Sequence, residues 1–197
     1  MDNRIVVRLC KEAKEEFMAY VKAHTVPKYQ DLVVDLLDKT PVCITDEAIA
    51  CCRFTHESIT VFVSTNSSYS TLVHELAHVK YRSLSVDTQL ALIKATCELC
   101  GLITDLNTFI KYKTPTPIEQ YLYSTVIDAY TIWHQVRPAD GYAWLGHEPG
   151  YGASSPEVYA TREAFANMCE LLFYGVEVPA DLKPFAEIVD NSLNEVV

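Results

Sequence analysis

Two histidines and a glutamate stand at a spacing that suits metal-assisted hydrolysis. His74, Glu75 and His78 belong to an H-E-x-x-H sequence. Residues four apart lie on one face of a helix, so His74 and His78 can direct two imidazole nitrogens at one point. Zinc takes nitrogen ligands at roughly 2.0–2.1 Å. Glu75, beside the first ligand, can accept the proton of a metal-bound water that attacks a carbonyl. The motif therefore predicts a zinc hydrolase, most often a peptidase.

The sequence around the motif predicts a helix that follows a β-hairpin. Small polar residues at 66–71 can cap the start of a helix. The apolar residues expected on its buried face are Leu72, Val73, Leu76, Ala77 and Val79. Upstream, residues 48–54 and 58–65 have the β-branched and aromatic content of two strands. A plain core helix is the competing interpretation, but buried histidines and a buried glutamate would still need polar partners.

A catalytic zinc ion usually has three protein ligands, and the third must lie far from this motif. The residue six positions after His78 is neither histidine nor aspartate, so the extended H-E-x-x-H-x-x-G-x-x-H pattern is absent. Glu163 is the preferred third ligand, because Ser155 and Pro156 predict the start of a helix that would carry it. His147 is the alternative third ligand. It lies in a stretch rich in glycine and aromatic residues, which predicts an ordered loop or lid.

The helix expected to carry Glu163 has two distinct faces. Its apolar stripe consists of Val158, Phe165, Cys169 and Leu172. Glu163, Asn167 and Glu170 follow one another at steps of four and three residues on another face. A polar acceptor four residues after a glutamate ligand can hold the second ring nitrogen of a ligand histidine and fix its tautomer. Asn167 is therefore the expected acceptor.

These features together resemble the gluzincins, the zincin metallopeptidases whose third ligand is a glutamate on a later helix. Residues 158–165, Val-Tyr-Ala-Thr-Arg-Glu-Ala-Phe, are similar to the third-ligand helix of the anthrax lethal factor-like peptidases. The resemblance covers residues 48–82 and 150–174. It implies a zinc site of His74, His78 and Glu163, with Glu75 as the general base. The match to the thermolysin-type E-x-x-x-D is partial, because Asn167 replaces the aspartate.

The resemblance also implies a tyrosine that assists the oxyanion, located just before the third ligand. Pro156 occupies the expected position in this chain. Tyr151 is the preferred substitute, because a Gly-Tyr-Gly loop can bring its ring over the site, and Tyr159 is the other candidate. A packed ring with a locally bonded hydroxyl is an equally good interpretation of either residue.

The predicted elements describe an α+β chain rich in helices. A chain of 197 residues is long enough to bury a full core. Further helices are predicted over residues 11–23, 30–37, 86–111, 118–135 and 181–196, and a short strand over residues 41–44. The expected architecture is a single zincin-like metallopeptidase domain over residues 1–197. It would have a small mixed β-sheet, an active-site helix and a helical insertion over residues 86–136.

Charge and cysteine content restrict the classes of partner and the compartment. The net charge of −10 disfavours nucleic acid as a partner. The H-E-x-x-H motif makes a peptide or protein the expected substrate. Seven cysteines, an odd number, fit a reducing compartment better than a disulfide framework. Neither a signal-peptide core nor a long uncharged apolar run is found. A cytoplasmic location is expected, and a virus-encoded or non-classically exported protein would have the same features.

A non-catalytic protein is the alternative to the peptidase. Such a chain would be a structural or binding protein on a zincin fold that retains a zinc site. Glu75 favours the enzyme, because a scaffold with a metal site has no need of a general base beside it.

Overall fold

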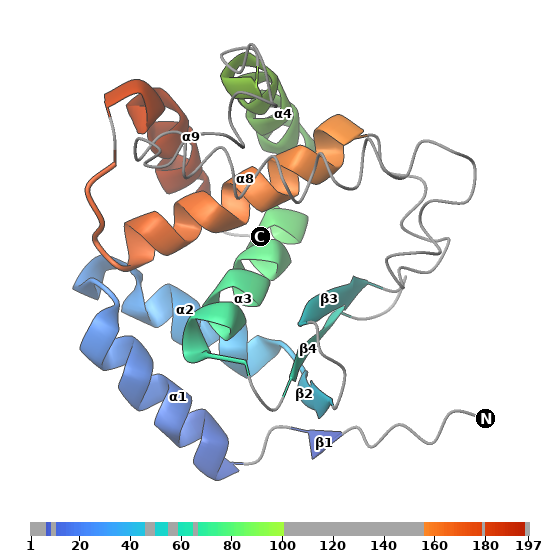
Figure 1. Ribbon diagram of the computed structural model, residues 1–197, viewed down its shortest axis with the longest axis vertical. Helices are drawn as coiled ribbons and strands as arrows, with labels where there is room; N and C mark the ends of the chain where they lie inside the picture. The colour runs from blue at the N-terminus through green and yellow to red at the C-terminus, as the bar shows by residue number, and fades with distance from the viewer. Residues whose placement is uncertain are drawn as a thin grey trace, which may run out of the picture. The chain divides into compact units, whose positions relative to one another are not determined.

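The computed structural model describes two compact units of the chain (Figure 1). One unit comprises residues 1–83 and 169–177, and the other comprises residues 84–168 and 178–197. Within them, the residues whose structure is described are 7–8, 11–45, 50–54, 59–64, 67–100, 156–178 and 180–195. Tyr151, His147 and the helix predicted over 118–135 lie outside these ranges.

The first unit contains a small mixed sheet of four strands in the order β1-β2-β4-β3. The strands are β1 (Val7–Arg8), β2 (Val42–Thr45), β3 (Cys51–Phe54) and β4 (Ile59–Ser64). Strands β2 and β4 are parallel, whereas β1 pairs with β2 and β3 pairs with β4 in antiparallel fashion. The hairpin predicted before the motif is therefore confirmed as β3 and β4, and the expected short strand is β2.

One face of this sheet is part of the hydrophobic core. Val42 and Cys52 are both in register with Val61, and residues in register on neighbouring strands point to the same face. All three side chains are buried, as is Val63 two residues along β4. The alternation of β-branched residues in β4 thus marks the inward face, as the period of two predicts.

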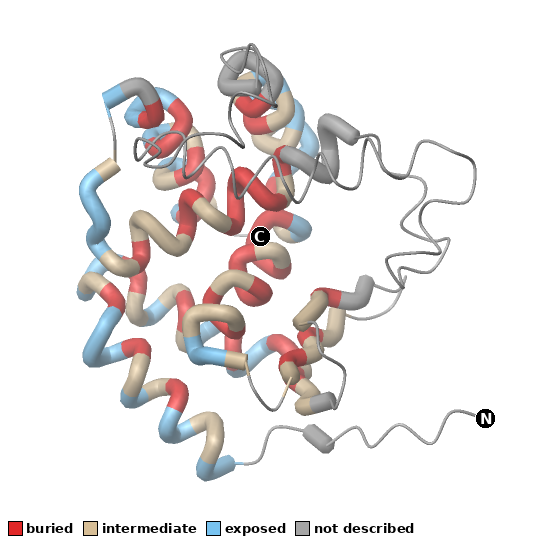
Figure 2. The backbone as a smooth tube through the Cα atoms, in the orientation of Figure 1, coloured by how far each residue is buried: buried red, intermediate tan, exposed pale blue. Residues whose placement is uncertain are grey.

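Three helices of the first unit complete its core. They are α1 (Lys11–His24), α2 (Pro27–Lys39) and α3 (Tyr69–Ser83). Helix α3 contacts strands β3 and β4, and all five residues of its predicted apolar face are buried, as the red segments of Figure 2 illustrate. Helix α2 begins at Pro27, three residues before the predicted start. Proline suits the first turn of a helix because its missing N–H would have no partner there.

The second unit contains helix α4 (Val86–Cys100), a short 3-10 turn (Ala180–Leu182) and helix α9 (Lys183–Leu193). Helices α4 and α9 contact one another, and Leu92 and Val189 contribute buried side chains to this unit. The carboxylate of Glu195 accepts hydrogen bonds from the backbone N–H of Ser85, at 3.2 Å, and from the Thr88 hydroxyl. A carboxylate at the start of α4 satisfies free N–H groups and suits the positive end of the helix dipole.

Helix α8 (Pro156–Phe173) contributes residues to both units and begins at the proline that the sequence predicted. Its end has the hydrogen bonds of a Schellman motif: Val176 N–H donates to Leu171 O at 2.9 Å and Gly175 N–H donates to Leu172 O at 3.2 Å. Gly175 has a φ of +64°, which glycine adopts without the steric cost of a Cβ atom.

Replacing Gly175 by alanine should lower the free energy of unfolding by about 2 kcal/mol, because the left-handed conformation penalises any Cβ atom. The new Cβ would also lie 2.7 Å from Cγ1 of Val26, which would have to move. Urea unfolding of both proteins measures the effect. Val176→Ala, at an exposed neighbouring position, is the control and should change little. An unchanged midpoint for Gly175→Ala would show that the helix end does not require this backbone conformation.

No helix within the described ranges has both the length and the apolar character needed to cross a membrane.

Candidate metal centre

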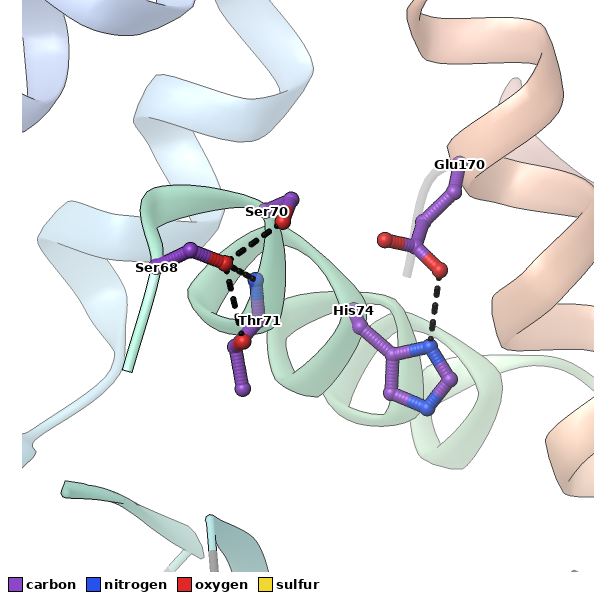
Figure 3. Close-up of polar contacts among 5 residues, drawn as sticks. All are labelled: Ser68, Ser70, Thr71, His74 and Glu170. Atoms are coloured by element: carbon purple, nitrogen blue, oxygen red, sulfur yellow. Dashed lines mark hydrogen bonds and ion pairs between the residues drawn. The ribbon is translucent and has the colours of Figure 1, made fainter. Parts of the chain in front are cut away.

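Helix α3 positions the motif, and a serine fixes where this helix starts. The Ser68 Oγ accepts a hydrogen bond from the backbone N–H of Thr71 at 3.3 Å, as a helix N-cap does (Figure 3). Ser68 Oγ also lies 2.6 Å from Ser70 Oγ and 3.1 Å from Thr71 Oγ1. The small polar run before the motif therefore does what its composition predicted. It sets the helix start so that both histidines follow within the first three turns.

His74 and His78 lie on one face of α3. The centroids of their rings are 4.8 Å apart, and the ring planes meet at 84°. Two imidazoles in this edge-to-face arrangement can point one nitrogen each toward a common position without stacking on one another. The four-residue spacing thus produces the juxtaposition expected of it.

Glu163 joins the two histidines. One potential ligand atom from each of His74, His78 and Glu163 lies within 4.8 Å of the others. Glu163 belongs to α8, and its exposed fraction is only 8%. A carboxylate at such depth requires compensation by a cation or by hydrogen-bond donors. Two imidazoles and one carboxylate are a donor set that zinc accepts, so the residues present fit this metal.

A second carboxylate of α8 contacts the motif. The Oε2 atom of Glu170 lies 3.1 Å from Nδ1 of His74, and the side chains of these residues are 28% and 19% exposed. Figure 3 shows Glu170 reaching from α8 to the His74 ring on α3. The sequence placed Glu170 on the polar face of its helix and predicted Asn167 as an acceptor, but it did not predict the contact of Glu170 with His74. The sequence does contain the relevant spacing. Glu170 lies seven residues, about two helical turns, after Glu163, so both residues are on the same face of the helix.

Glu75 is almost completely enclosed, with an exposed fraction of 7%. Its backbone oxygen accepts a hydrogen bond from the thiol of Cys52 on strand β3, with Sγ 3.6 Å away. Burial, and then the negative charge of Glu75, raise the pKa of the Cys52 thiol well above its ordinary value. Cys52 therefore stays protonated at neutral pH and is not an activated nucleophile. Its role is to connect the edge of the sheet to the residue expected to act as base.

The remaining predicted site residues are Tyr151, His147 and Tyr159. Tyr151 and the alternative ligand His147 fall outside the described residues. Tyr159 lies within α8 by its backbone, and nothing further is assigned to its ring. The helical insertion expected over 86–136 is described only as far as Cys100, where α4 ends.

Comparisons of the chain with protein-family models, with curated proteins and with solved structures give no match.

Proposed function

We propose that this chain is a zinc-dependent metallopeptidase on a zincin-like fold of the gluzincin type. The observation that carries the proposal is the convergence of His74, His78 and Glu163 within 4.8 Å, with the H-E-x-x-H glutamate buried on the same helix as the two histidines. Glu163 lies 85 residues after His78 in the sequence, so the H-E-x-x-H motif alone does not require the three residues to converge.

His74, His78 and Glu163 would hold the zinc ion and leave a fourth position for water or substrate. When bound, zinc would supply Lewis-acid chemistry: it lowers the pKa of a coordinated water and polarises the carbonyl of the scissile bond. Three protein donors are the number found in catalytic sites, whereas structural zinc sites usually have four.

Glu75 would carry the proton during hydrolysis. Its carboxylate accepts a proton from the attacking water and donates it to the nitrogen of the departing amine. The Cys52 thiol anchors the backbone of Glu75, and low exposure limits the rotamers open to its side chain. A base held in one place loses little entropy on reaching the transition state.

A peptide is the substrate that the surrounding structure suits best. Among the strands that the structure describes, β3 is at the edge of the sheet, and its Cys52 contacts the backbone of Glu75. An extended peptide that added to this edge as a further strand would run close to the proposed base. Main-chain hydrogen bonds would then supply affinity irrespective of the side chains of the substrate.

Metal analysis combined with a peptide-library digestion tests the proposal. The protein should bind about one zinc per chain, as a single site of three residues implies. It should also cleave members of the library, lose this activity to a chelator and regain it with added zinc. His74→Ala should abolish both properties, whereas His24→Ala, which removes an exposed histidine of α1, should retain both. A zinc-loaded wild type that cleaves nothing in the library would contradict the peptidase assignment.

A further inference from the structure

We propose that Glu170 is the positioning residue for His74: it holds Nδ1 of the imidazole and thereby commits Nε2 to the metal. This inference rests on the proposed zinc site. The evidence for the positioning role is the 3.1 Å contact between Glu170 Oε2 and His74 Nδ1. The role is additional to that of Asn167, which the spacing to Glu163 predicts as an acceptor for a ligand histidine.

The chemistry of the pair fixes its hydrogen-bond direction. An ionised carboxylate can only accept, so His74 Nδ1 must carry the hydrogen and donate it to Glu170. In a neutral imidazole the other nitrogen then has a free lone pair, which is the form that binds a metal. Without the carboxylate, either tautomer would be accessible and the ring could turn over. Part of the free energy of zinc binding would then be spent on fixing the orientation of the His74 ring.

The part of α8 that carries Glu170 is fixed in place within its own unit. Backbone N–H of Val26 donates to Phe173 O at 2.8 Å, so the turn between α1 and α2 holds the end of α8. The Tyr20 hydroxyl donates to the Tyr174 hydroxyl at 3.4 Å, one residue beyond the helix. These two contacts hold the end of α8 against α1 and the turn that follows α1. The segment that carries Glu170 is therefore held by bonds that do not involve the histidine.

Glu163 and Glu170 are seven residues apart on one continuous helix, so they occupy nearly the same face about two turns apart. One rigid element thus supplies a metal ligand and the support for another ligand. A rotation of α8 that displaced one carboxylate would displace the other as well. The partnership makes metal affinity sensitive to Glu170 although this residue does not bind the metal.

Zinc affinity in competition with a chromogenic chelator tests the role. Glu170→Ala should weaken zinc binding by about 10–100-fold, the usual cost of removing an outer partner of a metal-binding histidine. Glu170→Gln retains an acceptor oxygen without the charge, so its loss should be smaller. Glu177→Ala, which removes an exposed carboxylate from the same unit, is the matched control and should bind zinc as the wild type does.

Nitrogen NMR of the metal-free proteins, above the pH at which the imidazole is charged, supplies a readout that general destabilisation would not move. The wild type should show His74 with its hydrogen on Nδ1, and Glu170→Ala should show a shift toward the Nε2 form. Unchanged affinity and tautomer in Glu170→Ala would overturn the positioning role while leaving the zinc site intact. A wild type with the expected tautomer but no zinc binding would instead overturn the proposed function on which the role rests.

Discussion

Replacing Glu75 by glutamine should lower peptidase turnover by roughly 10²–10⁴-fold, the contribution of a positioned general base. Glutamine keeps the size and the hydrogen-bonding capacity of glutamate but loses the basic carboxylate. Zinc should stay bound, because the proposed ligands are His74, His78 and Glu163. The fold should also be retained, because the side chain keeps its volume and the backbone oxygen that accepts from Cys52 is unchanged.

Steady-state kinetics on a peptide that the wild type cleaves, with zinc content measured on the same samples, check this expectation. Glu187→Gln is the matched control, because it makes the same chemical change at an exposed position of α9. Full activity in Glu75→Gln would remove the general base from the proposal. A full biological role in Glu75→Gln, together with a wild type that cleaves nothing, would favour the scaffold alternative.

The local pattern of the sequence predicted much of the first unit. The period of two in residues 59–64 indicated a strand, and Val61 and Val63 are indeed the buried pair of β4. The small polar run before residue 72 predicted a capped helix, and Ser68 provides the cap. Such features depend on residues within a few positions of one another, so the local sequence is enough to predict them.

Contacts between segments that are distant in the sequence could not be predicted in the same way. His74 and Glu170 are separated by 96 positions, and no local pattern states which of the polar residues of α8 meets the ring. The spacing to Glu163 predicted Asn167 as an acceptor for a ligand histidine, and the structure adds a contact of Glu170 with Nδ1 of His74 that no spacing indicated. The contact between Cys52 and Glu75 was also not predicted, because it joins residues 23 positions apart on different elements.

The start of helix α2 was predicted three residues too late. The sequence predicts this helix over residues 30–37, three residues after Pro27. The structure uses the same proline as the first residue of the helix. Proline interrupts a helix in its interior but favours one at its start, so its effect depends on a boundary that the sequence alone did not locate.

Loss of Glu163, the proposed third ligand, should weaken zinc binding strongly. Four-ligand structural sites bind zinc with about 10–16 kcal/mol, roughly 3 kcal/mol per ligand, so Glu163→Ala should weaken zinc retention by at least about 10²-fold. The buried position of Glu163 enlarges the effect, since no exposed carboxylate can move into its place without being desolvated. Glu170 is not a substitute, because its Oε2 is engaged with Nδ1 of His74.

Chelator competition with three variants decides the assignment. Glu163→Ala should lose zinc, His147→Ala should retain it, and Glu187→Ala, at an exposed position of α9, should match the wild type. Circular dichroism on the same samples establishes that Glu163→Ala is folded, so that lost metal is not a consequence of lost structure. Strong zinc loss in His147→Ala with none in Glu163→Ala would select the loop histidine as third ligand. The gluzincin assignment would then fall, because it depends on a helical glutamate, whereas the roles of His74, Glu75 and His78 depend only on the H-E-x-x-H helix and would stand.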